Sequence, residues 1–425
     1  MSRENPAAMS DESIVVAVSR WLNENWSPTL SLVEWRNRLV DGGWAAPHWP
    51  AEWYGRDYNM QQAALVANVF AEKGVVGAAQ TGPRRLAAET ILAHGSDDQK
   101  QRFLRPILTG EHAWCQLFSE PGSGSDLAGS STRAERVKDH WVINGQKVWN
   151  TSAHHADYGL LLARSDWDLP KHQGLSYFLI DVHQPGVEVR QLKQMNGHAS
   201  FNEVFITDAI VSHEDLIGGE GNGWAVAATT LSFERRSFAQ RRLGGQSKNR
   251  VGRVYEEYAS ELAIDNAPYT WYPQREGRVD LVLSRARESG AISDPVIRQE
   301  IARLLSLSKA AQFASASAEA ERRAGSNEVI PAGSIGKLAA SVIARQAAHV
   351  HTLISGPAAM FSGPDSDENG LVAETLLSVP AISIAGGTDE IQRNIIAERV
   401  LGMPKEQRAD TGPFRDIKRN ASDKT

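Results

Sequence analysis

The stretch Ser119-Glu120-Pro121-Gly122-Ser123-Gly124-Ser125-Asp126 is the most informative part of this sequence. Its small residues let backbone N–H groups and hydroxyl groups approach a ligand closely, because no bulky side chain stands between them. Glycine and serine are also common in ordinary loops. Taken alone, the stretch therefore predicts a loop, and its role has to be argued from the sequence on either side.

Residues 1–113, which precede this stretch, have the spacing of helices. Apolar residues recur three and four positions apart, and Ser96 followed three residues later by Gln99 is the capping-box pattern that starts a helix. We therefore expect an N-terminal helical domain over these residues.

Residues 114–220 contain short runs rich in β-branched and aromatic residues, which predict a β domain. Asn144-Gly145 lies between two of these runs and predicts a hairpin turn, because a type I′ turn needs positive φ at both central residues. The predicted strands are 141–143, 146–149, 158–163, 175–182, 187–192 and 201–207.

Helical spacing returns in residues 221–404. Asp294-Pro295 predicts a helix start, with an N-cap and a proline at the first helical position, and this helix is expected to end near Gly325. Residues 264–279 contain two prolines and several aromatics and are expected to form an inserted loop. The polar tail 405–425 is expected to be poorly ordered. The fold class is thus α+β with several domains.

The composition excludes several classes of protein. Lys and Arg number 45 against 51 Asp and Glu, a formal net charge of −6, which provides no basic surface for nucleic acid. Cys115 is the only cysteine, so no internal disulfide or CxxC metal site can form, as is usual in a reducing cytoplasm. No secretory signal and no run of 18 apolar residues is visible, so we expect no membrane span.

Two further segments accompany the opening stretch. They are Gln146–Thr151 and Gly386-Gly387-Thr388-Asp389-Glu390-Ile391-Gln392-Arg393. Together the three resemble the acyl-CoA dehydrogenase family, whose order of helical, β and helical domains matches this chain. Other family-like segments are Gly82-Pro83, Asp98–Leu104, Phe201–Phe205, Gly218–Trp224 and Glu234-Arg235.

The resemblance implies a flavoprotein with an N-terminal helical domain, a middle β-barrel domain and a C-terminal four-helix bundle. FAD would lie between the β domain and the C-terminal helices, with an acyl-CoA thioester against the flavin. The residues that would contact FAD are Phe118, Ser119, Gly124, Ser125, Trp149, Thr151, Thr388 and Glu390. The residues that would contact substrate are Ser125, Ser232 and Arg235. Without the family, Trp149 reads as a core aromatic of the barrel and Thr388 as a helix cap.

The general base is where this sequence departs from many members of the family. They carry Glu directly before the Gly-Thr pair of the C-terminal loop, whereas this chain has Gly386 there, which cannot accept a proton. Other branches of the family carry the base on a helix, in a Glu-Arg pair that matches Glu234-Arg235. Glu234 is therefore the expected base, and burial beside the flavin would raise its pKa toward neutrality. The alternative is an ordinary surface glutamate.

The backbone N–H of Gly386 would still polarise the thioester carbonyl, as the family does at this position. The missing carboxylate also leaves space beside the substrate's α carbon, which favours branched, bulky or sterol-derived acyl groups. The Arg-x-x-Phe-Gly stretch with which the family reaches FAD across a subunit boundary is absent between Arg250 and Pro295. FAD binding could therefore need a non-identical partner chain.

The resemblance leaves three functions open. The first is α,β-desaturation, with an electron-transfer flavoprotein as electron acceptor and a cytoplasmic homodimer or homotetramer as the assembly. The second is an oxygen-using enzyme of the same fold, either an acyl-CoA oxidase or a flavin monooxygenase. The third is a non-catalytic subunit of a heterotetramer. His154-His155 are interpreted as loop histidines rather than metal ligands, and Cys115 as a packing residue.

Overall fold

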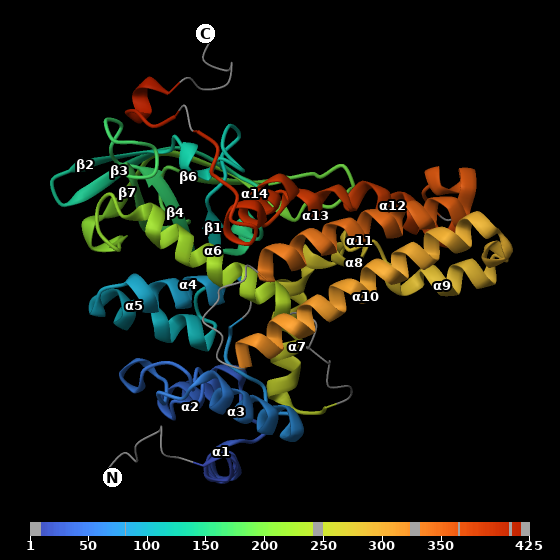
Figure 1. The fold of residues 1–425 in the computed structure, drawn as a ribbon. Coiled ribbons are helices and arrows are strands. Elements are labelled where there is room, and N and C mark those ends of the chain that lie inside the picture. The colour runs from blue at the N-terminus through green and yellow to red at the C-terminus, as the bar shows by residue number, and fades with distance from the viewer. Residues whose placement is uncertain are drawn as a thin grey trace. The chain divides into compact units, whose positions relative to one another are not determined.

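The computed structural model describes residues 10–80, 82–240, 250–323, 332–363, 366–407 and 410–417 (Figure 1). Contacts within the chain divide it into two compact units. The first unit comprises Met1–Leu192, Ser200–Pro268 and Asp410–Thr425. The second comprises Lys193–Ala199 and Tyr269–Ala409. The three predicted domains match the helix–strand–helix order of the elements, while the predicted domain boundaries stay predictions.

The N-terminal part of the first unit is helical, as predicted. The Ser96 hydroxyl accepts a hydrogen bond from the Gln99 N–H at 3.2 Å, and the Ser96 N–H donates to Gln99 Oε1 at 3.0 Å. This reciprocal capping starts the last of the helices. The helices are α1 (Asp11–Asn25), α2 (Leu32–Asp41), α3 (Met60–Lys73), α4 (Gly82–His94) and α5 (Asp97–Thr109).

The β part of the first unit is one mixed sheet with the order β6-β7-β3-β2-β4-β5-β8, in which β1 also pairs with β4 (Figure 1). Strand β5 is buried on both faces. Tyr177 on one face belongs to one hydrophobic cluster and Phe178 on the other face belongs to a second, so β5 lies between the two clusters. The strands are β1 (Trp114–Leu117), β2 (Arg133–Val137), β3 (His140–Val148), β4 (Tyr158–Arg164), β5 (Leu175–Asp181), β6 (Val187–Leu192), β7 (Phe201–Ser212) and β8 (Leu216–Ile217).

The hairpin predicted at Asn144-Gly145 is wrong. Strand β3 runs straight through these residues, with a bulge in its pairing to β7, and the β2–β3 turn lies earlier, at Lys138-Asp139. A Cβ on Gly145 would lie 2.5 Å from Thr132 Oγ1, so glycine is needed here for a close approach of two chains. The same dipeptide is compatible with both structures, and pairing with β7 decides between them.

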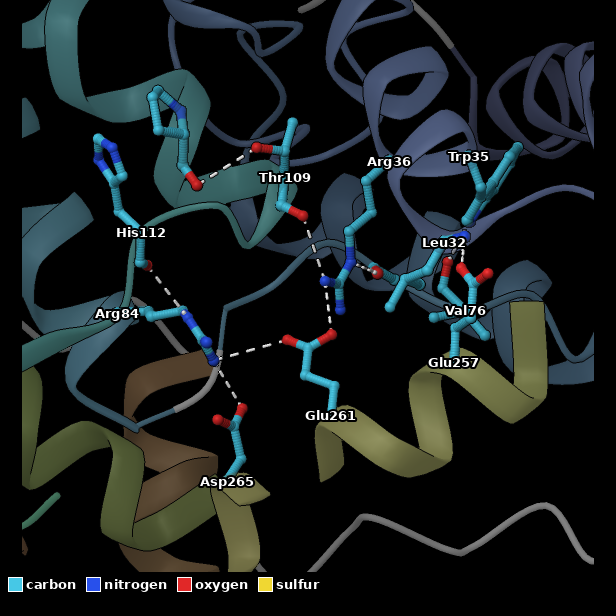
Figure 2. Close-up of polar contacts among 12 residues, drawn as sticks. Leu32, Trp35, Arg36, Val76, Arg84, Thr109, His112, Glu257, Glu261 and Asp265 are labelled. Carbon is cyan, nitrogen blue, oxygen red and sulfur yellow. Dashed lines mark hydrogen bonds and ion pairs between the residues drawn. The ribbon is translucent and has the colours of Figure 1, made fainter. Parts of the chain in front are cut away.

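Helix α7 (Arg253–Asn266) belongs to the first unit, although its sequence lies in the part predicted as the C-terminal helical domain. Three carboxylates spaced four residues apart face the N-terminal helices (Figure 2). Glu257 accepts a hydrogen bond from the Leu32 N–H at 2.7 Å. Glu261 forms ion pairs with Arg36 at 2.7 Å and with Arg84 at 3.6 Å, and Asp265 forms one with Arg84 at 2.7 Å. Val254 of α7 is also buried in the hydrophobic cluster of the N-terminal helices, so contacts with distant residues place α7 in the first unit.

All regular elements in the described residues of the second unit are helices. Asp294 Oδ1 accepts from the Val296 N–H at 2.7 Å and so caps the long helix that the sequence predicted to start at Asp294-Pro295. The helices are α8 (Tyr272–Arg275), α9 (Val279–Glu288), α10 (Pro295–Arg323), α11 (Ala332–Ser355), α12 (Leu371–Ser378), α13 (Pro380–Ile384) and α14 (Asp389–Arg399). The position expected for the end of α10, Gly325, lies outside the described residues.

The segment 264–279 is not the open loop expected from its prolines and aromatics. It holds the end of α7, a turn of 3-10 helix (Ala267–Tyr269) and α8. Trp271 is only 1% exposed and Arg275 only 4%. The aromatic residues bury apolar surface, which favours short helical turns over an exposed loop.

The expected poor order of the tail 405–425 stays a prediction, and residues 408–409 and 418–425 lie outside the described residues. Residues 410–417 pack against the loop that follows β4, and Phe414 is 2% exposed. The one aromatic residue of this polar segment is thus the one that is buried.

In the second unit, Glu368–Arg399 is long and apolar enough to meet the criteria for a membrane-spanning helix. The chain is broken there at Ala385, which is extended, and at Gly386, whose φ is +68°, so it is not one continuous helix.

Candidate active site

The loop that follows β1 is held by a buried ion pair. Lys147 is fully buried in β3, and its Nζ donates to the Phe118 carbonyl at 3.0 Å and to Glu120 Oε1 at 2.8 Å. Glu120 also accepts hydrogen bonds from the backbone N–H groups of Ser131 at 2.7 Å and Thr132 at 2.8 Å. The start of the predicted cofactor loop is therefore fixed from β3 and from the chain that enters β2.

The charge of Glu120 is strongly favoured in the folded protein. Burial alone would raise the pKa of its carboxyl, but the Lys147 ammonium and the donors around it lower that pKa to about 2. Glu120 is consequently ionised at any pH near neutrality. Glu120 holds the loop because it accepts hydrogen bonds from Ser131, Thr132 and Lys147, which lie outside the loop.

The residues at the tip of this loop are open. Gly124 and Ser125 are exposed, Ser119 is half-buried and Phe118 is buried. A Cβ placed on Gly122 or Gly124 would meet nothing within 4 Å. The tip of the loop thus exposes backbone and hydroxyl groups above a base fixed by hydrogen bonds, and the four FAD contacts predicted in this loop stay a prediction.

Trp149 lies on the surface, and a network of buried side-chain amides holds the backbone around it. Its backbone has φ of +64°, and its indole is 59% exposed and touches Phe201 edge-on at 5.7 Å. The next residue, Asn150, is 2% exposed and donates from Nδ2 to the Gln116 carbonyl at 2.8 Å. The interpretation of Trp149 as a core aromatic is wrong. Thr151, predicted beside the flavin ring edge, is half-buried next to it.

His154 supports this network. The side chain of Asn202 donates to the Asn150 carbonyl at 2.7 Å, so Asn202 Oδ1 is left to accept from His154 Nδ1 at 2.9 Å. Nε2 of His154 then accepts from Gln191 at 3.0 Å. Burial lowers the pKa of His154, which favours this neutral form. His154 and His155 lie in a 3-10 turn, and their interpretation as loop histidines rather than metal ligands stays a prediction.

Helix α6 (Gly223–Gln240) carries Glu234, the predicted base. One turn earlier, Thr230 is fully buried, and its hydroxyl contacts the Tyr177 hydroxyl at 3.1 Å and the Thr90 hydroxyl at 2.9 Å. Tyr177 in turn packs edge-on against the Phe118 ring at 5.7 Å. Residues four apart share a helix face, so Glu234 lies on the face of α6 that is fastened to the cofactor loop.

Glu234 is half-buried on α6. Ser232, predicted to bind substrate, donates its hydroxyl to the Thr229 carbonyl at 2.8 Å. The side chain of Arg235 lies outside the described residues. The first unit therefore brings together Phe118, the loop after it and the helix that carries Glu234.

The second unit holds the other predicted contacts, between α13 and α14. Gly386 and Gly387 have φ of +68° and +87°, and the Gln392 side chain donates to both of their carbonyls, at 3.1 Å and 3.3 Å. The Gly386 N–H makes no hydrogen bond within the described part of the chain. Thr388 caps α14 by accepting from the Ile391 N–H at 3.3 Å. Glu390 is exposed and lies 3.5 Å from Arg393.

Asp389, which the sequence did not single out, anchors this second loop. It is 2% exposed and binds Lys337 at 3.1 Å, Ser341 at 2.8 Å and Arg345 at 2.8 Å, all from α11. Burial works against its charge, but these donors lower the pKa of Asp389 below its ordinary value. The loop glycines are thereby held against α11.

The residues of the first unit fit a flavin cofactor. An exposed indole on a rigid backbone and an open glycine-serine loop provide the flat apolar surface and the donors that a flavin requires. Sequence reasoning missed the groups that make this surface rigid: Glu120, Lys147, Asn150 and Asn202. A lysine or an asparagine in a strand has no local sequence pattern that indicates such a role, and the role becomes visible only from the complete burial of the side chain in the fold.

Cys115, predicted as a packing residue, is buried, and burial raises the pKa of its thiol to about 12.

Comparison with known proteins identifies the family. Three family profiles match successive parts of the chain: the acyl-CoA dehydrogenase N-terminal domain at residues 1–111, the middle domain at 115–209 and the C-terminal domain at 276–401.

Two relatives come from Mycobacterium tuberculosis. The acyl-CoA dehydrogenase IpdE1 is 34% identical over 381 residues, which cover 88% of each chain. The acyl-CoA dehydrogenase FadE34 is 35% identical over 86% of this chain, but this chain spans only about half of FadE34, 46% of its length. Among solved structures, one described as the Tcur3481-Tcur3483 steroid ACAD aligns with a TM-score of 0.64 and 21% identity, covering 96% of this chain and 100% of the other.

Acyl-CoA dehydrogenases are FAD-dependent oxidoreductases of lipid degradation, and the fold and cofactor expected from the sequence are confirmed. The three profile matches and IpdE1, which is similar over 88% of its length, agree on the family. This chain is a member of the acyl-CoA dehydrogenase family.

Proposed function

We propose that this protein desaturates an acyl-CoA thioester between its α and β carbons, producing the 2-enoyl-CoA. The observation that carries this proposal is the contact chain Phe118–Tyr177–Thr230, which joins the cofactor loop to α6 within one unit. Glu234 follows Thr230 by one helical turn on the same face. A carboxylate is thus held on the helix that is fastened to the loop expected to hold FAD.

Each group has a defined task in this proposal. Phe118, Ser119, Gly124, Ser125, Trp149 and Thr151 hold FAD in the first unit, and Thr388 and Glu390 contribute from the second. Bound FAD supplies the acceptor for the β hydride. Glu234 removes the α proton in the same step, so that a C=C bond replaces the two broken C–H bonds. The free N–H of Gly386 donates to the thioester carbonyl oxygen, which makes the α proton more acidic.

The proposed substrate class depends on the glycine at position 386. Glycine leaves open the volume that a glutamate side chain would fill, so we propose branched, bulky or sterol-derived acyl groups. Ser125, Ser232 and Arg235 are proposed to contact the substrate. An electron-transfer flavoprotein is proposed as the electron acceptor, and the assembly as a cytoplasmic homo-oligomer or a heterotetramer.

The test is an anaerobic titration of the FAD-loaded protein with straight-chain, 2-methyl and steroid-side-chain acyl-CoAs, followed by the flavin absorbance. We expect bleaching with a branched or steroid thioester. Glu234→Gln should lower the rate of bleaching by about 10³-fold, a typical effect of removing a general base. The matched control is Glu256→Gln, an exposed carboxylate on α7. Equal rates in Glu234→Gln and the wild type would contradict the assignment of the base.

Reduction followed by fast reoxidation in air, without an electron-transfer flavoprotein, would instead support an oxidase. A protein that binds FAD but is reduced by no thioester would support a monooxygenase. A chain that binds no FAD without a partner would support a role as one subunit of a heteromeric enzyme.

A further inference from the structure

The C-terminal segment 410–417 pairs with the loop that follows β4. The Phe414 N–H donates to the Leu169 carbonyl at 3.0 Å, and the Arg415 N–H donates to the Trp167 carbonyl at 3.0 Å. Pro413 forms an isolated bridge with Pro170. These contacts fix the backbone of the segment, so the position of the Phe414 side chain is defined by the fold.

Phe414 covers a buried arginine that holds the far end of the cofactor loop. Arg164 is fully buried, and its guanidinium donates to the carbonyls of Ala128 at 2.6 Å and Ser130 at 3.0 Å. It also donates to the Lys171 carbonyl at 3.2 Å. The Phe414 ring centre lies 3.4 Å from the guanidinium carbon. The ring therefore keeps water from a cation whose donors fix the chain directly after Asp126.

Lys171 makes the second link between the tail and the cofactor loop. Its side chain is only 6% exposed, and its Nζ forms an ion pair with Asp126 at 2.7 Å and another with Asp410 of the tail. Asp126 closes the loop, because its carbonyl accepts from the Ser123 hydroxyl at 2.5 Å and from the Gly129 N–H at 2.8 Å. One buried ammonium thus ties the tail to the residue that ends the Ser119–Asp126 stretch.

We propose that residues 410–417 are a positioning element for the cofactor loop, acting through Arg164 and Lys171, and that they set the affinity for FAD. This inference rests on the proposed FAD contacts of Ser119, Gly124 and Ser125. Lys147 and Glu120 fix the start of the loop from within the sheet, whereas its end is fixed by groups that the tail covers or pairs with. Without the tail, water reaches the Arg164 guanidinium and competes with the loop carbonyls, and Lys171 loses one of its two carboxylates.

The experiment compares FAD binding by five apo-proteins: wild type, a chain ending at Ala409, Phe414→Ala, Lys171→Met and Arg415→Ala. Arg415 is the matched control, since it lies in the same segment but its side chain pairs with the exposed Asp168. The dissociation constant of FAD is measured by flavin fluorescence. We expect it to rise about tenfold in Phe414→Ala, which corresponds to about 1.4 kcal/mol, and further in the truncated chain. Arg415→Ala should stay within about twofold of the wild type.

A second readout does not depend on FAD. In the apo-protein, an endoprotease that cleaves on the amino side of aspartate should cut the Ser125–Asp126 bond faster in Phe414→Ala and in the truncated chain than in Arg415→Ala, because the end of the loop is released. A peptide of residues 410–425 should restore both protection and FAD affinity to the truncated chain, whereas the same peptide carrying Phe414→Ala should not. Phe414→Tyr, which keeps the ring, should behave as the wild type.

Unchanged FAD affinity and unchanged cleavage in folded Phe414→Ala and Lys171→Met would overturn the inference. If the truncated chain does not fold, these two point variants decide the question. A general loss of folding stability would instead lower the unfolding temperature without a selective increase in cleavage of the Ser125–Asp126 bond, and this result also counts against the inference. If the wild type binds no FAD, the proposed function fails, and the protease assay still tests the role of the tail.

Discussion

The two loops predicted to contact FAD are built by different means. In the first unit, the loop Phe118–Asp126 is held by side chains distant in sequence: Lys147 from β3 and Lys171 from the loop after β4. In the second unit, the loop Gly386–Thr388 is shaped by its own glycines and by Gln392, only five and six residues away. The first loop is held mainly by distant side chains, whereas the glycine turn of the second is shaped locally and only its end, at Asp389, is tied to α11. The two should therefore respond to different substitutions.

The largest effect is expected from Lys147→Met. This change removes the ammonium that pairs with Glu120 and leaves a buried carboxylate without its counterion, which typically costs about 3–5 kcal/mol. The midpoint of urea unfolding and FAD binding should both decrease. Lys138→Met, at the exposed β2–β3 turn, is the control and should change stability by less than about 0.5 kcal/mol. Similar midpoints for the two variants would show that the ion pair does not hold the loop.

Acid should weaken the same loop. The pKa of Glu120 is about 2 in the folded protein against an ordinary value of 4.5. Its contribution is fully present above about pH 4.5 and is lost as the pH falls toward 2, a total of about 3 kcal/mol. Urea unfolding from pH 7 to pH 3 should therefore show a shallower loss of stability in Glu120→Gln than in the wild type. Glu135→Gln, an exposed carboxylate on β2, should follow the wild type. Parallel pH profiles for all three would contradict the low pKa.

The smallest effects on stability are expected when one glycine of each loop is replaced by alanine. Gly387 has φ of +87°, and a Cβ there would lie 2.6 Å from Gln392 Nε2, so Gly387→Ala should cost about 1–2 kcal/mol. Gly124 has open space around its Cα, and Gly124→Ala should change stability by less than about 0.5 kcal/mol. Thermal unfolding measures both. A larger loss in Gly124→Ala would reverse the comparison and indicate that the first loop also depends on its own glycines.

Local patterns in the sequence predicted a large part of the fold. The capping box at Ser96, the helix start at Asp294-Pro295 and strands such as 187–192 depend on neighbouring residues, and the structure confirms them. The hairpin at Asn144-Gly145 was wrong because the same dipeptide suits a turn or a bulged strand, and pairing with β7 decides between the two. The motif residues Ser119–Asp126 and Gly386–Arg393 identified the family because they are contiguous in the chain.

What the sequence alone established is therefore the family and its cofactor, since both are indicated by short runs of neighbouring residues, while the residues expected to contact FAD stay a prediction. The tertiary structure decided how those residues are held. Lys147 meets Glu120 across 27 positions of sequence, α7 packs on the N-terminal helices through Glu261 and Asp265, and Phe414 covers Arg164. None of these pairs has a local signature, because burial and ion pairing between distant residues depend on the packed fold rather than on spacing along the chain.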